Sequence, residues 1–445
     1  MTLRLRVVAT LALAASLASP ALAQLPCDPL PPPTGVVVDV YPADAPSLAG
    51  IVAAAASGTT IRLHDGYYDL SCGDAGCRLA FSTPGVTLRS ASGNRDGVVL
   101  DGAYLTNELV SIYAGGVVIA DLTLMHAYDH PLHISGLAGS PISGILLHNL
   151  RVVDPGQQGI KVNPNVDGYV DDSTLECSSI ELTDAGRTFI RDNCYTGGID
   201  VHMAQGWLVR RNRISGFWCN DGLSEHGIHF WRSCRDTVVE ENVILDCARG
   251  IGFGLGSTGT ARVYPDDPYP GVGYKGHIDG VIRNNFVAVA SAGLLASPDG
   301  FDTGIGLEQA YGAKVVHNTV ASTQEPLSSS IEWRFPNSVV EVFNNLASSD
   351  LLARDGASAV AGGNLEYAPL IWLTDVAAGD LHLTAAAGAA VDAGVLLPAG
   401  LADTDFDGDV RDASPDVGAD ELGTGAIFDD GFESGDTSAW ANALP

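Results

Sequence analysis

Six side chains that could take part in chemistry occupy alternate positions in three short segments near the middle of the chain. They are Lys161, Asn163, Asp200, His202, His229 and Trp231. The positions between them are apolar, as in Ile160 and Val162, and alternate residues of a β-strand point to opposite faces. We therefore expect the six side chains to share one outward face. Lysine and histidine can transfer protons there, and tryptophan offers a flat apolar surface to a sugar ring.

Two of these segments and the one that follows them are near-copies of one another. A glycine, an apolar residue and strict alternation recur in GGIDVH (197–202), HGIHFW (226–231) and RGIGFG (249–254). Between them lie RRNRISGF (210–217) and EENVILD (240–246), each with an asparagine just ahead of its apolar residues. Recurrence at intervals of roughly 20 to 30 residues predicts stacked coils built from half-buried strands.

One asparagine per repeat is expected to form a column at a single turn, where its amide binds the backbone and the asparagines above and below. The predicted column comprises Asn149, Asn212, Asn242, Asn285, Asn318 and Asn345. Nearer the start of the chain, the alanine-rich segment at 47–56 has Ser47 as a candidate N-cap and predicts a short helix. The first coil of a solenoid exposes an apolar end, so we expect this helix to cap it.

This pattern resembles the right-handed parallel β-helix repeat proteins, a group that includes pectate lyases and sugar-binding or sugar-hydrolysing repeats. The resemblance covers residues 47–425 and implies an all-β fold, a single-stranded right-handed parallel β-helix. Loop insertions are expected near 163–197 and 256–276. The same fold hosts lyases, hydrolases, epimerases and non-enzymatic surface proteins, so it does not choose between activities.

The ends of the chain indicate export. Arg4 and Arg6 precede an apolar run that ends at a small-residue cleavage site, which predicts a signal peptide at 1–23. A proline-rich lead follows at 24–46, and an acidic tail at 426–445 contains a segment similar to a short C-terminal tail of exported bacterial proteins. We expect a secreted bacterial protein, in the periplasm, outside the cell or at its surface.

The formal net charge of −30 argues against nucleic acid and anionic membrane as partners. No stretch after the signal peptide is apolar for long enough to span a bilayer. We expect a monomer whose partner is a polysaccharide.

Eight cysteines in an exported chain predict disulfides. Cys72 pairs most simply with Cys77, and Cys177 with Cys194, because each pair brackets a local loop. Cys219 and Cys247 lie one repeat apart, so stacked coils could bring them together. Cys27 and Cys234 are only what remains after these pairs, and the sequence does not fix their pairing.

The fold resemblance favours β-elimination on a uronate-containing glycan. In this interpretation Lys161 removes the proton from C5 of the sugar, because low-dielectric groove walls ease its own deprotonation. His202 or His229 then protonates the departing oxygen, and Asp200 orients Lys161.

Several further residues are candidates for binding the substrate or a cation. Trp231, His133 and Asn163 would contact the sugar, while Arg187 or Arg334 would pair with its carboxylate. Asp200 and Glu308 are candidate ligands for a calcium ion as cofactor. Glycines at 252 and 254 would leave room for the ligand beside Trp231.

Other interpretations of the same residues stay open. The outward side chains could pack beneath the loops, or His202, His229 and Asp200 could hold a metal ion. A non-catalytic carbohydrate-binding or cell-surface protein is the main alternative function, followed by a glycoside hydrolase or a uronate epimerase. Near the C-terminus, the acidic segment at 403–421 predicts either closure of the last coil, with Arg411 pairing the acids, or a calcium loop.

Overall fold

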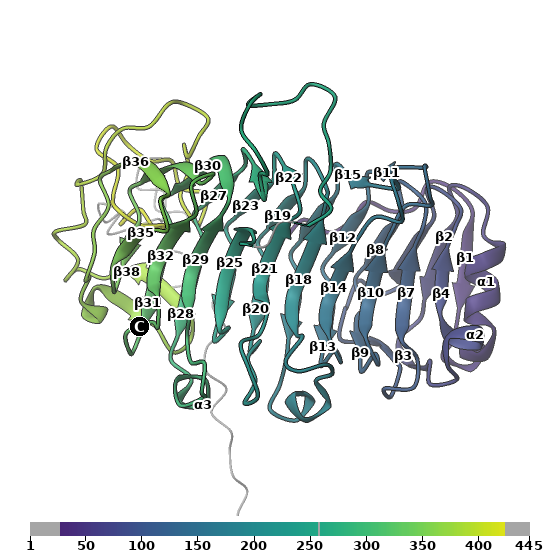
Figure 1. Ribbon diagram of the computed structural model, residues 1–445. Coiled ribbons are helices and arrows are strands. Elements are labelled where there is room, and N and C mark those ends of the chain that lie inside the picture. Colours follow the sequence, from purple (N-terminus) through teal and green to yellow (C-terminus); the bar gives the residue numbers. More distant parts are fainter. Residues whose placement is uncertain (1–26, 257–258, 423–445) are drawn as a thin grey trace, which may run out of the picture.

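The computed structural model describes residues 27–256 and 259–422. Over these residues the chain winds into a right-handed parallel β-helix with three long sheets, as the sequence predicted (Figure 1). The predicted signal peptide at 1–23 and the acidic tail at 426–445 lie outside the described residues. Within them, each helix is too short or too polar to cross a membrane.

Each coil contributes one strand to sheet A, then one to sheet B, then one to sheet C. The main path of sheet A runs through β1 (Val37–Val40), β2 (Thr60–Leu63), β5 (Thr87–Ser90), β8 (Val118–Ala120), β12 (Leu146–His148), β16 (Thr174–Glu176), β19 (Leu208–Arg210), β23 (Val238–Glu240), β27 (Val281–Arg283), β30 (Ala310–Val316), β33 (Val339–Phe343) and β36 (Ser358–Gly362). The short strands β22 (Cys234–Arg235) and β26 (His277–Ile278) extend it alongside β30. Strand β1 shows that the solenoid begins within the predicted lead at 24–46.

Sheets B and C are parallel stacks of the same kind. Sheet B contains β3 (Gly66–Asp69), β6 (Val98–Asp101), β9 (Thr123–Met125), β13 (Arg151–Val153), β17 (Ser179–Glu181), β20 (Arg213–Ser215), β24 (Val243–Leu245), β28 (Phe286–Val289), β31 (Thr319–Ser322) and β34 (Leu346–Ala347). Sheet C contains β4 (Leu79–Phe81), β7 (Glu108–Ile112), β10 (His130–Ile134), β14 (Gln158–Val162), β18 (Gly197–His202), β21 (His226–Trp231), β25 (Arg249–Gly254), β29 (Thr303–Glu308), β32 (Ser329–Arg334) and β35 (Leu351–Arg354).

A glycine near the start of five successive strands of sheet C explains the repeated Gly-apolar pair. These glycines are Gly159, Gly198, Gly227, Gly250 and Gly304. A Cβ atom at Gly159 would lie 2.6 Å from the Ile180 side chain, and one at Gly304 would lie 2.5 Å from Val320. Branched side chains of sheet B therefore fill the space in front of the glycines. The next apolar residue of each strand points inward and is fully buried, as at Ile199.

An asparagine ladder crosses the turn between sheets A and B. Its members are Asn212, Asn242, Asn285, Asn318, Asn345 and Asn364. Each Nδ2 donates to the Oδ1 of the next asparagine at 2.9 to 3.0 Å, and that Oδ1 also accepts the backbone N–H of the previous asparagine. The predicted column is thus confirmed except at its first member.

Asn149 does not belong to the ladder. It has a left-handed backbone, with φ of 49°, and its Nδ2 donates to Asp121. Leu150 occupies the ladder position of that coil, where Ser178 Oγ accepts its N–H.

The N-terminal end is capped by a helix, as predicted. Helix α1 (Leu48–Ala54) follows the 3-10 helix η1 (Pro42–Ser47), and Leu48 and Val52 are buried in the core. The short helix α2 (Asp74–Cys77) lies at the same end of the molecule (Figure 1).

The sequence predicted that the acidic segment near the C-terminus closes the last coil. The structure shows that the C-terminal segment instead packs against one of the long sheets. Residues 365–422 pack on the outer face of sheet B and include the 3-10 helix η3 (Leu370–Trp372) and the antiparallel pair β37 (Leu373–Asp375) and β38 (Asp380–Leu383). Phe406 stacks on Phe286 of sheet B with ring centroids 4.0 Å apart. The outer face of sheet B is apolar here, whereas a strand exposed to solvent would carry polar side chains on that face. The C-terminal segment packs on this apolar face.

The acidic segment at 403–421 is fixed by hydrogen bonds. Arg411 binds Glu421 at 2.9 Å and Asn284 at 3.2 Å, so the predicted pairing of Arg411 with an acid is confirmed. The Asp405 carboxylate instead accepts three backbone N–H groups, from Asp407, Asp409 and Glu421. These contacts fix the turn through Asp405, and the alternative of a calcium loop stays a prediction.

Three disulfides staple the described residues, and only one of the predicted local pairs is right. Cys72 pairs with Cys77, but Cys177 pairs with Cys27, and Cys194 pairs with Cys219. Cys234 and Cys247, which had been assigned to disulfides, are buried free thiols. The Cys194–Cys219 bond joins two loops that follow sheet B in successive coils.

The predicted insertion at 163–197 contains a nearly complete coil. Strands β15 (Val170–Asp171), β16 and β17 lie within it, and β15 pairs with β11 (Ile142–Ser143). The true insertion is the loop between β17 and β18, which contains the 3-10 helix η2 (Gly186–Phe189). The second predicted insertion lies between β25 and β26, and its Arg262 binds Asp171 at 2.6 Å.

We expect Asn285→Ala to lower the free energy of unfolding by at least about 2 kcal/mol, because it leaves several buried backbone and amide groups unsatisfied. Asn149→Gly is the matched control: glycine accepts the left-handed backbone, and we expect a change below about 1 kcal/mol. Denaturant unfolding followed by circular dichroism measures both values. Equal losses from the two variants would show that the ladder carries no special stability.

The docked C-terminal segment should loosen as pH rises. His382 lies between Asp380 at 2.6 Å and Asp407 at 2.9 Å, near Asp420. Burial opposes the charge, yet these carboxylates raise the pKa of His382 from 6.5 to about 9. The protonated His382 ring therefore stabilises the folded protein fully below pH 6.5. This contribution, up to about 3 kcal/mol of the free energy of unfolding, is lost as the pH rises through about 9.

The check is hydrogen exchange of residues 365–422 and denaturant unfolding at a series of pH values between 6 and 10. His382→Gln should remove this part of the pH dependence. An unchanged slope in that variant would assign the dependence to other groups.

Candidate functional site on the outer face of sheet C

The strand register brings the predicted site residues together. Lys161 of β14 pairs in register with Asp200 of β18, and Asp200 pairs with His229 of β21. The neighbouring column holds His202 beside Trp231. Five of the predicted residues therefore lie on adjacent strands of one face.

This face is covered rather than open, which corrects the expectation of solvent-exposed side chains. Lys161 is 5% exposed, Asp200 is 2% exposed and His229 is fully buried. Tyr195, from the loop stapled by Cys194–Cys219, lies over Lys161 and accepts a hydrogen bond from its Nζ at 2.9 Å. Trp231 and Tyr195 stay half-buried and form part of the remaining surface.

Asp200 is the centre of the cluster. Its Oδ2 binds Lys161 Nζ and lies 3.1 Å from His202 Nε2, while its Oδ1 accepts the Trp231 Nε1–H at 2.8 Å. His229 Nδ1 lies 3.7 Å from the same Oδ1. A carboxylate so buried is stable only because it is paired and hydrogen-bonded on both oxygens.

The neighbouring Asp200 carboxylate favours the ammonium form of Lys161, which argues against its predicted role as the base. Burial alone would lower the pKa of Lys161, but the Asp200 carboxylate outweighs burial and raises it. Burial likewise opposes ionisation of Asp200, yet Lys161 and His202 hold its pKa well below the ordinary value. The pair therefore supplies a fixed positive charge beside a fixed negative one.

His202 is the better proton acceptor in this cluster. Burial lowers the pKa of His202 below 6.5, although Asp200 opposes the shift, so the ring is neutral at pH 7. Its Nε2 lies 3.1 Å from Asp200 Oδ2 and 3.3 Å from Lys161 Nζ, so a protonated Nε2 donates to the carboxylate and an unprotonated one accepts from the ammonium. In the first of these tautomers the lone pair is on Nδ1. Its Nδ1 has no hydrogen-bond partner among the described residues, and this atom is not fully enclosed by protein.

His229 differs from the role expected of it. Its Nε2 donates to the Gly254 carbonyl at 3.0 Å, and its Nδ1 lies 3.4 Å from Glu225 Oε2. Burial opposes protonation, but Glu225 raises the pKa of His229. Because the ring is fully buried, His229 cannot reach a departing oxygen at the surface.

His133 and Asn163 form a contact beside the cluster. His133 Nε2 lies 2.6 Å from Asn163 Oδ1, and its Nδ1 binds Glu108. Burial alone would lower the pKa of His133, but Glu108 raises it. Both side chains are partly exposed. His133 pairs with Lys161 in register from the earlier coil, and Asn163 follows Lys161 by two residues in the same coil.

The glycines at 252 and 254 do not make an empty floor. A Cβ atom at Gly252 would lie 2.6 Å from His226 Nε2, and one at Gly254 would lie 1.8 Å from the Glu308 carbonyl oxygen. The His226 ring therefore occupies the space that the sequence assigned to a ligand.

Asp200 and Glu308 cannot share a calcium ion. They lie on β18 and β29, three strand steps apart, which is about 14 Å at the spacing of stacked strands. Both oxygens of Asp200 already have partners, and Glu308 faces Arg334 at 3.5 Å. The pair does not fit the predicted calcium site.

Neither predicted arginine reaches the cluster. Arg334 lies on β32, four strand steps from Asp200, and binds Asp355 at 2.8 Å. Arg187 stacks on Trp218 and donates to the carbonyls of Gly216 and Trp218 at 2.7 and 2.6 Å. Arg187 therefore holds two loops together, and these contacts occupy the guanidinium that was predicted to bind the substrate carboxylate.

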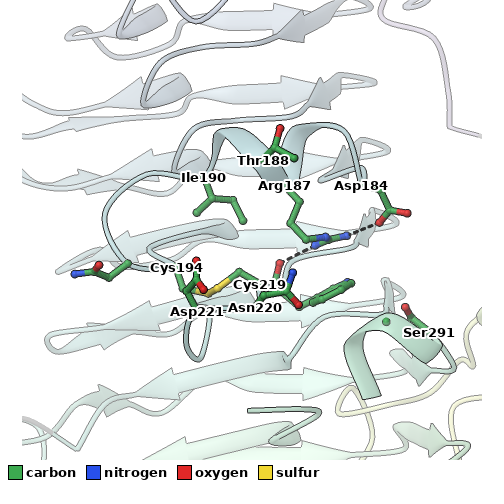
Figure 2. A pocket seen from close by; sticks show the side chains of 12 residues that line it. Asp184, Arg187, Thr188, Ile190, Cys194, Cys219, Asn220, Asp221 and Ser291 are labelled. Atoms are coloured by element: carbon green, nitrogen blue, oxygen red, sulfur yellow. Dashed lines mark hydrogen bonds and ion pairs between the residues drawn. A yellow bond between two sulfur atoms is a disulfide. The ribbon is translucent and has the colours of Figure 1, made fainter. Parts of the chain in front are cut away.

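Arg187 lines a cavity of about 640 Å³ next to the Cys194–Cys219 disulfide, shown in Figure 2. Asp184, which binds Arg187, also borders it, together with Asn220, Asp221 and Ser291. This cavity lies among loops that follow sheet B and does not contain Lys161, Asp200 or His202. Its position alone assigns it no part in chemistry at the cluster.

Two partly exposed residues of the site escaped the sequence analysis. Tyr195 belongs to an insertion whose path depends on the disulfide. Arg232 follows Trp231, and its guanidinium carbon lies 4.5 Å from the centre of that ring. Arg232 has no ion-pair partner within residues 27–256 and 259–422, so it is an uncompensated cation. The sequence could have indicated Arg232, because this basic residue directly follows Trp231, which was already a candidate for binding the sugar.

The chain was compared with known proteins. No family model matches it, and no curated protein matches it. Among solved structures, pectate lyase Pel9A has 14% identity and a TM-score of 0.50, covering 87% of this chain and 96% of its own.

Two further solved structures match the chain with lower TM-scores. The tailspike protein of E. coli bacteriophage HK620, in complex with a pentasaccharide, has 14% identity and a TM-score of 0.43, covering 69% of this chain and 53% of its own. The catalytic unit of a GH87 α-1,3-glucanase from Streptomyces thermodiastaticus has 15% identity and a TM-score of 0.41, covering 77% and 65%. These likenesses concern the fold, so activity must be argued from the residues.

The Lys161–Asp200 pair can be tested by stability. Lys161→Met leaves the Asp200 carboxylate buried without its ammonium, and we expect the free energy of unfolding to fall by about 3–5 kcal/mol. Adding Asp200→Asn removes the stranded charge while Oδ1 still accepts from Trp231, so most of the loss should return. Denaturant unfolding of the two single variants and the double variant completes the cycle; additive losses would contradict the pairing.

Proposed function

We propose that the protein binds a uronate-containing polysaccharide on the outer face of sheet C and cleaves it by β-elimination. The observation that carries the proposal is the convergence of Lys161, Tyr195 and His202. Lys161 Nζ lies 2.9 Å from Tyr195 Oη and 3.3 Å from His202 Nε2, so a fixed ammonium lies between a phenol and a neutral imidazole. The fold shared with pectate lyase Pel9A is compatible with this activity.

The reaction needs a proton acceptor, a proton donor and a cation. His202 Nδ1 takes the C5 proton, the electron pair of that C–H bond forms the C4–C5 double bond, and the C4–O bond breaks. Tyr195 gives its phenolic proton to the departing oxygen, and the adjacent Lys161 ammonium stabilises the phenolate. Proton exchange with water restores both side chains, and no other reactant is consumed.

Arg232 and Trp231 are suited to hold the sugar. The Arg232 guanidinium can bind a uronate carboxylate with two parallel hydrogen bonds and neutralise the charge that develops next to it. The half-buried Trp231 ring offers the adjacent flat surface. His133 extends the binding surface toward the preceding coil, and its contact with Asn163 links that surface to the coil of Lys161.

The test is incubation of the purified protein with polygalacturonate and alginate, with the ultraviolet absorbance of the unsaturated product as the signal. We expect His202→Gln to lower kcat at least about 100-fold while glycan binding is retained. Arg232→Gln should mainly raise KM. His64→Gln, far away at the N-terminal end, is the matched histidine control. Full turnover by His202→Gln would overturn its assignment as the base.

A non-catalytic carbohydrate-binding protein is the second candidate, favoured by how completely Lys161 and Asp200 are covered. In both cases Trp231→Ala should weaken retention on the glycan about tenfold, a loss of about 1.4 kcal/mol. Binding of a uronate glycan without any unsaturated product would establish this second function and reject elimination.

A further inference from the structure

A second group of side chains that could bind a metal ion lies at the start of β21. Glu225, His226 and His229 each offer one potential ligand atom, and these atoms all lie within 4.8 Å of one another. None of the three has a role in the elimination proposed above, and binding of an ion here does not depend on that chemistry.

The polar atoms of this group lack partners although they are enclosed. His226 is 5% exposed and His229 is fully buried. The Nδ1 atoms of both rings and Oε2 of Glu225 have no hydrogen-bond partner among the described residues. Buried polar atoms are normally satisfied, so three unsatisfied ones on residues that can converge on one ion indicate a missing ligand.

The orientation of His229 is that of a metal ligand. Its Nε2 faces a carbonyl, that of Gly254, and so carries the proton, which leaves a lone pair on Nδ1. A hydrogen bond from the second ring nitrogen to a carbonyl commonly orients a metal-binding histidine. The lone pair faces Glu225 Oε2 at 3.4 Å, so two acceptors confront each other unless a cation or a proton lies between them.

The 3.4 Å between His229 Nδ1 and Glu225 Oε2 suits two ligands of one transition-metal ion. Bonds of about 2.0–2.1 Å in a tetrahedral zinc site place neighbouring ligand atoms about 3.3 Å apart. Arg249, next to His226 in register, does not satisfy Glu225, because it faces Asp302 at 3.6 Å. We infer that Glu225, His226 and His229 bind a divalent transition-metal ion of the Zn²⁺ type, with a fourth position left for water.

The surrounding backbone is shaped for the His226 ring. A Cβ atom at Gly252 would lie 2.6 Å from His226 Nε2, whereas one at Gly306, the next position in register, would be 3.9 Å from it. Gly252→Ala and Gly306→Ala are therefore a matched pair, and only the former should displace a ligand.

The experiment uses the full-length protein without a polyhistidine tag, stripped with chelator and dialysed. Titration calorimetry with Zn²⁺ should give one site per chain, and Co²⁺ should give the visible absorption of a four-coordinate ion. Glu225→Gln, His226→Gln and Gly252→Ala should each weaken Zn²⁺ binding at least about tenfold. Gly306→Ala and His64→Gln should bind as the unaltered protein does.

Two results would overturn the inference. The first is the absence of Zn²⁺ and Co²⁺ binding by the stripped protein, which would leave a proton between Glu225 and His229. The second is binding that Glu225→Gln and Gly252→Ala leave unchanged, which would place the ion elsewhere. Glu225 is 25% exposed, so its variant should fold, and circular dichroism checks this. Zn²⁺ should also raise the melting temperature of the unaltered protein but not that of Glu225→Gln.

Discussion

Stacked parallel strands lie about 4.8 Å apart, and this spacing makes each position of a coil the neighbour of the same position in the next. A residue type that suits one coil is therefore met by its own kind above and below. The glycines of sheet C make room for branched side chains of sheet B at each level, and the asparagines satisfy one another across the turn. The same constraint forces Lys161, Asp200 and His229 into one line, so charge becomes concentrated wherever polar residues recur at one position.

The winding of the chain could be predicted because its signals are local. Alternation at Ile199 and Val201 defines a strand and its inward face without knowledge of distant residues, and the recurring glycine and asparagine mark the level of each coil. The local pair Cys72–Cys77 could be predicted, but the other disulfide partners could not, since their pairing depends on the paths of loops: Cys177 bonds to Cys27, 150 residues away in sequence. The return of residues 365–422 onto sheet B was also hidden, because its apolar anchors, such as Phe406, are scattered among acidic residues.

The candidate site was predictable in its membership and not in its chemistry. Register follows from the alternation, so the proximity of Lys161 and Asp200 was foreseen. Burial was only one of the open interpretations, because Tyr195 and Glu225 come from segments outside the repeat. That cover changes the electrostatics: with Asp200 sealed beside it, Lys161 keeps its proton, and the capacity to accept one moves to His202. A side chain's role thus depended on the lid above it more than on its own strand.

The docked C-terminal segment changes how such a molecule comes apart. In an ordinary solenoid each level touches only the next, so terminal turns can peel away one at a time. Here Ala378 accepts a hydrogen bond from Arg213, whereas Ala419 donates to Thr319, several levels along the axis. The segment acts as a strap laid lengthwise over the stack. Loosening the final turns requires lifting it from the middle ones, so separate layers are bound into a single mechanical unit.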